Sequence, residues 1–280
     1  YYNELTGGTA YYHFLEQLEK DYANKKGEIM ARLQEVSRKL FTRANMLVNY
    51  TADDKGYEQL PQNLKLLADK LPQGSGEKHA FTHLVKNVNE GLKTSAQVDY
   101  VARCGNFRDA GLEYTGALKI LQVILSYDYL WLNIRVKGGA YGCVSGFGRS
   151  GEGYLVSYRD PNLKETNDIY EGIPAYLEAF DPDERDMTKY VIGTISNLDA
   201  PLTPSVKGSR GLSAYLSGVT EEMMQTERDQ ILGAAKEDIR ALAAQVRAVL
   251  ATGSFCVVGN EEKIEANRGM FGEVSSLTRG

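Results

Sequence analysis

The chain has 280 residues, of which 42% are hydrophobic and 25% are charged, and its formal net charge is -5. This length is enough for a sizeable core and for more than one structural unit. The excess of acidic residues argues against nucleic acid or an anionic membrane as the main partner. The three cysteines are scattered and odd in number, so neither a disulfide framework nor a cysteine-based metal site is expected.

The start of the chain and its most apolar segment bear on whether the chain is a fragment and on its cellular location. Residues 120–134 are the most apolar, but Asp128 interrupts them and they are too short to cross a bilayer. The chain opens on Tyr1 and Tyr2, without an initiator methionine or a signal peptide. We therefore expect a piece of a longer polypeptide, located in the cytoplasm, with an organellar matrix as the alternative.

The first part of the chain is predicted to be mainly helical. Apolar residues at helical spacing predict helices over residues 6–22 and 28–41, followed by a short strand over 46–50. A further helix is expected over residues 60–71, because Pro61 occupies its first turn, a position that suits proline. The residues that follow, 72–77, are polar and rich in glycine, as is typical of a linker.

The second part combines strands with helices. Alternating side chains predict strands over residues 94–103, 141–147 and 153–159, of which the last two form a hairpin. Thr220 is a favourable residue to precede a helix. Helical spacing predicts helices over residues 111–125, 163–180, 184–198, 206–216 and 221–232.

The end of the chain repeats the outline of residues 28–71. A helix is predicted over residues 237–250, a strand over 255–258 and a last helix over 265–277. The shared outline suggests two related units, of which the first is truncated. Hairpin strands together with long helices predict an α+β fold, in which an antiparallel sheet has helices packed on one face.

Residues 126–148, SYDYLWLNIRVKGGAYGCVSGFG, join a predicted helix to a predicted strand. The helix has an apolar stripe, and the two glycines Gly138 and Gly139 are expected to end it. The stripe consists of Tyr127, Leu130, Trp131 and Ile134. In the strand, one face carries mainly glycines, which would let another backbone come close. These glycines are Gly142, Gly146 and Gly148.

Arg135 and Tyr141 lie on either side of the two glycines, so a guanidinium and a phenol meet at one corner. This arrangement suits binding of a peptide carbonyl. A structural interpretation is also open, because an arginine near a helix end often binds the last carbonyls and a tyrosine at the start of a strand often packs in the core.

Three other patterns resemble functional sites. The Gly146-x-Gly148-x-x-Gly151 run matches a dinucleotide fingerprint, but a strand follows it where a helix is needed. Cys143 has no histidine nearby in the sequence to activate it as a nucleophile. His79 and His83 have the spacing of two zinc ligands on a helix, but no glutamate lies between them, and surface or linker residues are the simpler interpretation.

The block RVKGGAYG, residues 135–142, resembles the C-terminal half of the pitrilysin/insulinase-type zinc metallopeptidases, and within them the presequence-protease (falcilysin-like) branch. The likeness runs through nearly the whole chain in order. Further similar stretches are AYYHFLEQLE (10–19), NEG (89–91), SAQVDYVARCGNF (95–107), YLWLNIRVKGGAYG (129–142), YRDPNL (158–163) and YVIGTISNLDAPLTP (190–204).

The resemblance implies a zinc-dependent endopeptidase of two halves that degrades unstructured oligopeptides. The first half would hold zinc through an H-x-x-E-H motif, which occurs nowhere in these 280 residues, so this chain would carry no metal ligands and would be inactive alone. Its partners would be the N-terminal half of the same polypeptide and a peptide substrate. Residues 1–72 would be the end of a third peptidase-like unit, 73–84 a linker and 85–280 the fourth unit.

The resemblance also assigns roles to the residues of the corner. Arg135 and Tyr141 would be catalytic residues that reach the bound peptide near the zinc, and Gly142 would join them in binding substrate. Two alternatives stay open: a family member without catalysis that acts as a scaffold or peptide-binding subunit, and a self-contained metal-binding module that uses His79 and His83.

Overall fold

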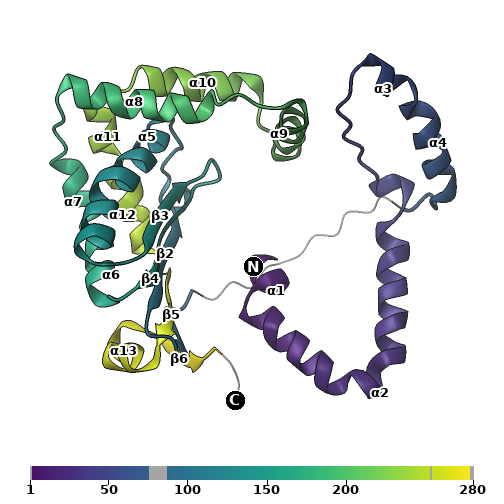
Figure 1. Cartoon of the computed structure of the whole chain (residues 1–280), viewed down its shortest axis with the longest axis horizontal. Helices are drawn as coiled ribbons and strands as arrows, with labels where there is room; N and C mark the ends of the chain where they lie inside the picture. Colours follow the sequence, from purple (N-terminus) through teal and green to yellow (C-terminus); the bar gives the residue numbers. More distant parts are fainter. Residues whose placement is uncertain (1, 76–86, 253, 278–280) are drawn as a thin grey trace. The chain divides into compact units, whose positions relative to one another are not determined.

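The computed structural model describes residues 2–75, 87–252 and 254–277 (Figure 1). The chain divides into two compact units. The first comprises Tyr1–Val85 and Pro201–Val219, and the second comprises Lys86–Ala200 and Thr220–Gly280. Within the described residues, each helix is either too short or too polar to span a lipid bilayer.

The described part of the first unit is helical. Its elements are α1 (Tyr2–Gly7), α2 (Thr9–Leu40), η1 (Arg43–Asn45), α3 (Asp54–Glu58), α4 (Leu60–Lys70) and α9 (Pro204–Ser217). The two helices predicted over residues 6–41 are one continuous helix, α2, which passes through Gly27 without a break. Residues 46–50 are not a strand, although their side chains favour one, because a strand needs a partner and no strand is described in this unit.

The second unit is built on a six-stranded sheet with the order β3-β4-β2-β5-β1-β6. Its strands are β1 (Glu90–Thr94), β2 (Asp99–Asn106), β3 (Gly142–Phe147), β4 (Glu152–Asp160), β5 (Ser254–Asn260) and β6 (Glu273–Ser276). The pairs β3–β4, β4–β2 and β2–β5 are antiparallel, whereas β1 pairs in parallel with both β5 and β6. The predicted α+β class is confirmed, and the sheet is mixed rather than antiparallel throughout.

The helices of this unit cover one face of the sheet, as predicted (Figure 1). They are α5 (Ala117–Ile124), α6 (Lys164–Glu171), α7 (Ile173–Glu178), α8 (Glu184–Leu198), α10 (Glu221–Leu232), α11 (Lys236–Ala241), α12 (Ala243–Ala251) and α13 (Glu261–Ala266). Short helical segments η2 (Phe107–Ala110), η3 (Leu125–Tyr129), η4 (Trp131–Lys137) and η5 (Arg268–Met270) complete the unit. The ranges predicted for α8 and α10 agree with the structure, and the Thr220 hydroxyl accepts a hydrogen bond from the Met223 amide, as expected of a cap.

The two faces of the sheet differ in burial. Val101, Leu155 and Val257 point to the helices and are fully buried, with the core of the unit around them. The alternate residues form the other face, where Tyr100 and Tyr154 are each about two-fifths exposed. The strand-helix alternation of the sequence therefore produces a two-layer unit with one open sheet face.

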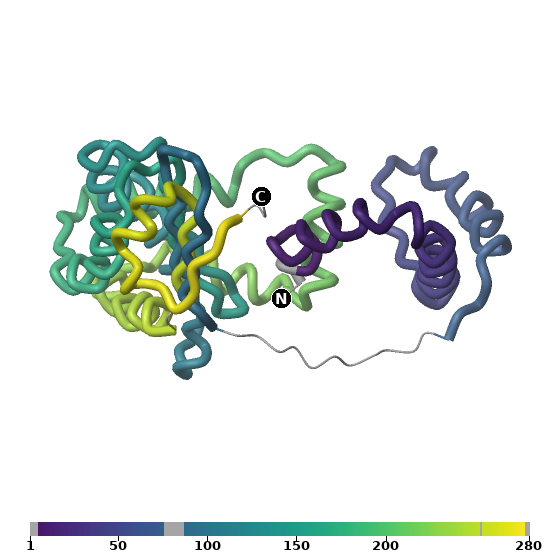
Figure 2. Tube along the Cα trace, turned by 90° about the horizontal axis from the view of Figure 1, so that it is seen from below, coloured from purple at the N-terminus to yellow at the C-terminus, as the bar shows by residue number. Residues whose placement is uncertain are grey.

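The C-terminal segment, yellow in Figure 2, returns to the strands that follow residue 87. The helix predicted over residues 265–277 is wrong, because α13 ends at Ala266 and Glu273–Ser276 forms β6. Gly269 and Gly272 weaken a helix here, and pairing with β1 gains backbone hydrogen bonds. The predicted helix-strand-helix outline is therefore found at the end of the chain, as α12, β5 and a shortened last helix α13, but not over residues 28–71, where the strand is absent.

Candidate functional site

The helical segment that carries Arg135 is wound more widely than an α-helix. η3 and η4 are π-helical, with more residues in each turn. This winding changes the predicted apolar stripe: Leu130 and Ile134 are fully buried, but Tyr127 is 71% exposed and Trp131 is 39% exposed. Trp131 is thereby turned from the core to the surface, beside Arg135.

The two glycines end this segment as predicted. η4 stops at Lys137, and Gly139 has a left-handed backbone with φ of 81°, which favours glycine. The amide of Gly139 donates to the Arg135 carbonyl at 3.0 Å, and the amide of Ala140 donates to the Ile134 carbonyl at 3.1 Å. These bonds close the helix end and direct the chain into β3.

Arg135 and Tyr141 come together at the corner, at the surface of the unit. The Arg135 guanidinium carbon lies 4.2 Å from the centre of the Trp131 ring and 5.8 Å from the centre of the Tyr141 ring. Tyr141 is 59% exposed. Attraction between the cation and the aromatic faces orders the guanidinium while its N–H groups stay open to a ligand. The structural interpretation of Tyr141 as a core residue is therefore wrong.

Two residues at the end of β4 complete this group and were not singled out in the sequence. The Arg159 guanidinium carbon lies 5.4 Å from the centre of the Tyr141 ring, and the centre of the Tyr158 ring lies 5.7 Å from the centre of the Tyr141 ring. Both belong to the YRDPNL stretch of the family resemblance, but no local pattern marks them as partners of Tyr141. We call Trp131, Arg135, Tyr141, Tyr158 and Arg159 the corner cluster.

The side chain of Asn162, two residues after the end of β4, connects the two sides of the corner. The Asn162 amide group donates to the Gly138 carbonyl at 2.6 Å, and the Asn162 backbone amide donates to the Asp160 carboxylate at 2.9 Å. Asp160 is fully buried and also accepts from the Thr166 hydroxyl at 2.7 Å. This network connects the end of η4 to the residues that follow β4.

The glycine-rich face of β3 is not bare. Gly142 is paired with Tyr158 and Gly146 with Tyr154, and a Cβ at either glycine would meet the partner's ring at 2.7 Å or less. The predicted close approach of another backbone is therefore wrong, because tyrosine rings from β4 occupy the space. Gly142 is buried, and the side chain that covers it at this position is that of Tyr158.

Cys143 is the thiol closest in sequence to the corner. Burial, and to a smaller extent the Asp160 carboxylate, raises the pKa of the Cys143 thiol to about 11, while Arg135 opposes the shift. The group is a neutral thiol near pH 7, which agrees with the sequence argument against a thiolate nucleophile.

The described residues do not fit a metal ion. Among residues 2–75, 87–252 and 254–277, no three histidine, cysteine or acidic side chains are grouped as metal ligands would be. His79 and His83 lie outside the described residues. The third histidine, His13, is paired with Glu16 at 3.0 Å. Zinc, implied by the family resemblance, therefore has no site in the described part of this chain.

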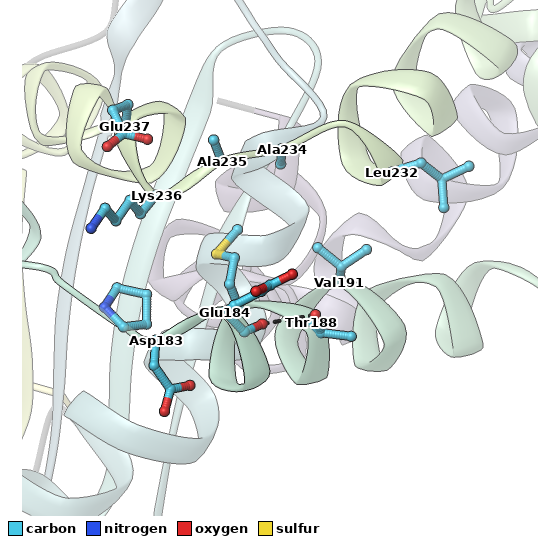
Figure 3. A pocket seen from close by; sticks show the side chains of 11 residues that line it. Asp183, Glu184, Thr188, Val191, Leu232, Ala234, Ala235, Lys236 and Glu237 are labelled. Atoms are coloured by element: carbon cyan, nitrogen blue, oxygen red, sulfur yellow. Dashed lines mark hydrogen bonds between the residues drawn. The ribbon is translucent and has the colours of Figure 1, made fainter.

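Figure 3 shows a surface pocket of about 510 Å³ away from the corner cluster. Its lining residues come from α8, from the end of α10 and from the start of α11. Its polar groups already have partners: the Thr188 hydroxyl donates to the Glu184 carbonyl, the Asp183 side chain accepts from the Asp186 amide, and Lys236 pairs with Asp181. The pocket is thus explained by helix capping and packing.

The chain is similar to known proteins over nearly its whole length. Residues 89–260 match the family description "PreP C-terminal domain". Protein HypA of Clostridium perfringens is 42% identical over 278 residues, which are 99% of this chain and 28% of that protein. Presequence protease 1, chloroplastic/mitochondrial, of Arabidopsis thaliana is 35% identical over 266 residues, or 94% of this chain and 25% of that protein.

A solved structure shares the fold. The peptidase M16 inactive domain from Pseudomonas fluorescens superposes with a TM-score of 0.51 at 14% identity, over 72% of this chain and 50% of that one. The chain spans about a quarter of the length of the curated relatives named above. By the match of residues 89–260, and in agreement with the resemblance of the RVKGGAYG block, the chain belongs to the presequence-protease family and corresponds to its C-terminal domain.

Proposed function

We propose that this chain is the half without zinc of a zinc-dependent endopeptidase that degrades unstructured oligopeptides. In this proposal the chain encloses the peptide together with the N-terminal half of the same polypeptide and supplies Arg135 and Tyr141 to the active site. The observation that carries the proposal is the exposed pair itself, with Arg135 stacked on Trp131 and close to the Tyr141 ring. Relatives named presequence proteases support the peptidase assignment.

Tyr141 has the properties of a hydrogen-bond donor to a reacting carbonyl. Its hydroxyl has no hydrogen-bond partner among the described residues, and the side chain is 59% exposed. Peptide-bond hydrolysis places negative charge on the carbonyl oxygen in the transition state, whichever group activates the water. A phenol that donates to this oxygen binds the transition state more strongly than the substrate, and removing one such donor costs about 2.7–4 kcal/mol.

Arg135 would bind and orient the peptide rather than exchange protons. The planar N–H groups of a guanidinium suit carbonyl and carboxylate oxygens. Because the Arg135 side chain stacks on Trp131, it has fewer conformations to lose when a ligand binds. Arg135 therefore fits a role in holding a substrate carbonyl next to Tyr141, with Tyr158 covering Gly142 as part of the same surface.

The proposal places the zinc ligands on the N-terminal half, because neither an H-x-x-E-H motif in the sequence nor a group of ligands in the described residues is available here. The 280-residue chain alone is then expected to cleave no peptides. The proposed location is the cytoplasm or an organellar matrix, and the named relatives include mitochondrial and chloroplastic proteins.

The test is Tyr141→Phe in the full-length enzyme. The expected result is a fall in kcat of about 10²- to 10³-fold, because one transition-state donor is lost, with unchanged zinc content. Tyr127→Phe is the matched control, since Tyr127 is also exposed but lies outside the corner cluster. Unchanged kcat in Tyr141→Phe would overturn the assignment. A parent protein without a zinc motif and without peptidase activity would favour the non-catalytic scaffold or peptide-binding subunit instead.

A further inference from the structure

Strand β4 contains a bulge immediately before it ends. Ser157 pairs with Val101 and Asp160 pairs with Asp99, so three steps along β4 match two steps along β2. Arg159 lies in this bulge with φ of 49°, and it is the one residue other than glycine with positive φ in the described parts of the chain. For an arginine the left-handed region is unfavourable, because its Cβ comes too close to the neighbouring carbonyl oxygen.

The bulge changes the direction of the Arg159 side chain. Gly153, Leu155 and Ser157 alternate toward the buried face of the sheet, and a regular strand would direct Arg159 to the same face. Instead Arg159 is exposed, and its guanidinium carbon lies 5.4 Å from the centre of the Tyr141 ring. Bulges commonly re-aim a side chain next to an active site in this manner.

The backbone at this position does not require an arginine. The Arg159 carbonyl accepts a hydrogen bond from the Tyr141 amide at 3.3 Å, and glycine would provide the same carbonyl without the strain of a left-handed side chain. What arginine adds is its guanidinium. The strain is therefore best explained by a function of this side chain toward whatever binds at Tyr141.

Two positive charges lie close to the Tyr141 ring. The guanidinium carbons of Arg135 and Arg159 both lie within 6 Å of the centre of the Tyr141 ring. Among the described residues neither arginine forms an ion pair, and the nearby carboxylate of Asp160 is buried and bonded to Asn162 and Thr166. Guanidiniums and a phenol hydroxyl can all donate hydrogen bonds to carboxylate oxygens, so these three groups around one ring suit a carboxylate ligand.

We propose, on the basis of the function proposed above, that Arg159 is a specificity-determining residue that binds, together with Arg135, a carboxylate of the peptide substrate. The carboxylate comes either from an acidic side chain near the cleaved bond or from the C-terminus of the peptide. Arg159 acts on substrate choice, whereas Tyr141 acts on the transition state of every substrate.

The experiment measures kcat/KM of the full-length enzyme for two matched peptide pairs. One pair differs by Glu or Gln next to the cleaved bond, and the other ends in a free carboxylate or an amide. For wild type the expected result is a preference for the carboxylate form in one of the pairs, and that pair identifies its source. In Arg159→Gln this preference falls by about fivefold, the effect of losing an exposed charge pair, while kcat on the neutral peptides is retained.

Two further variants separate side-chain charge from backbone strain. Arg159→Gly accommodates the left-handed backbone and should lose the preference as Arg159→Gln does, with equal or higher thermal stability. Arg159→Lys should retain part of the preference for the carboxylate form, because it keeps a positive charge. Arg185→Gln, which removes one exposed positive charge on α8, should leave the preference unchanged.

The proposal is overturned if wild type shows no preference in either pair, if Arg159→Gln keeps the preference, or if Arg185→Gln loses it equally. It is also overturned if Arg159→Gly and Arg159→Gln lower kcat/KM for all peptides by the same factor, since that is the behaviour of a purely structural residue. These results are independent of Tyr141→Phe, which tests the proposed function through kcat on all peptides.

Discussion

The phenol of Tyr158 lies directly over Gly142, where a Cβ would come within 2.4 Å of its hydroxyl oxygen. The same ring contacts Tyr141, with 5.7 Å between the ring centres. Gly142 is thus required less for its own flexibility than for the space that Tyr158 needs. The surface presented by the corner cluster depends on a glycine that is itself buried.

Gly142→Ala is expected to displace Tyr158 and to lose its contact with Tyr141. Because the end of a side chain can swing away, the cost in unfolding free energy should be about 1 kcal/mol. Gly105→Ala should cost more, since its Cβ would meet the backbone carbonyl oxygen of Val249 at 2.2 Å. Denaturant unfolding of both variants checks this order. Equal losses of stability in the two variants would mean that the Tyr158 ring cannot move aside. When Tyr158→Ala is added as a second substitution, it should restore stability to Gly142→Ala but not to Gly105→Ala.

Arg135→Gln is expected to change the fluorescence of the 280-residue chain, whose one tryptophan is Trp131. The guanidinium stacks on the indole at 4.2 Å, so its removal should expose the ring to water and shift the emission to longer wavelength. Arg185→Gln serves as the control. Identical spectra for wild type and Arg135→Gln would show that the stacked arrangement is not maintained in solution.

Thiol labelling should distinguish Cys104 from Cys143. Cys104 is exposed, whereas burial raises the pKa of Cys143 to about 11, so a disulfide reagent at pH 8 should modify Cys104 first. Since the folded-state pKa of Cys143 is raised, its contribution to stability is present below pH 9 and is lost as the pH rises toward 11.

The labelling measurement is clearest in a Cys256→Ser background, where modified peptides are assigned by mass. Similar rates for Cys104 and Cys143 at pH 8 would contradict the burial of Cys143 beneath the corner.

Glu227→Ala is expected to destabilise the second unit. The buried carboxylate accepts a hydrogen bond from the Tyr114 hydroxyl at 2.6 Å and pairs with Arg149 at 2.8 Å. Removing it takes the acceptor from the Tyr114 hydroxyl and the ion-pair partner from Arg149, at a cost of about 3 kcal/mol in unfolding free energy. Because Arg149 lies in the turn between β3 and β4, the variant should also loosen the hairpin from α10.

Urea unfolding measures this loss, with Glu222→Ala as the control for an exposed glutamate on the same helix. Glu227→Gln retains an acceptor for the Tyr114 hydroxyl and should therefore lose less unfolding free energy than Glu227→Ala. A cost for Glu227→Ala no greater than for Glu222→Ala would refute the role of the carboxylate in holding the hairpin.

The hairpin and the corner could be predicted from the sequence because their signals are local. Alternation over residues 141–147 and 153–159 predicts β3 and β4 closely, and two glycines between Arg135 and Tyr141 indicate where the helix ends. The length of the bend then requires the two side chains to meet. No information from distant parts of the chain is needed for these elements.

Elements that depend on distant partners were the ones that sequence reasoning missed. β1 has a weak strand pattern, and it forms because β5 and β6, from the end of the chain, supply its hydrogen bonds. Residues 46–50 have the stronger strand composition but find no described partner in their unit. Composition states what a segment favours, whereas pairing decides whether a strand exists.

Arg159 was missed for a different reason. Glycine, asparagine and aspartate are the usual signals of a left-handed backbone, and arginine is not among them. The bulge becomes visible only in the register between β2 and β4, and with it the position of a second guanidinium near Tyr141.

The place of β1 between β5 and β6 has a consequence for how the protein is made. During synthesis β1 leaves the ribosome early in its unit, while both of its neighbours belong to the last strands of that unit to emerge. Co-translational folding of this sheet therefore has to wait for the end of the unit, and a nascent chain arrested before residue 254 would hold β1 without any strand beside it.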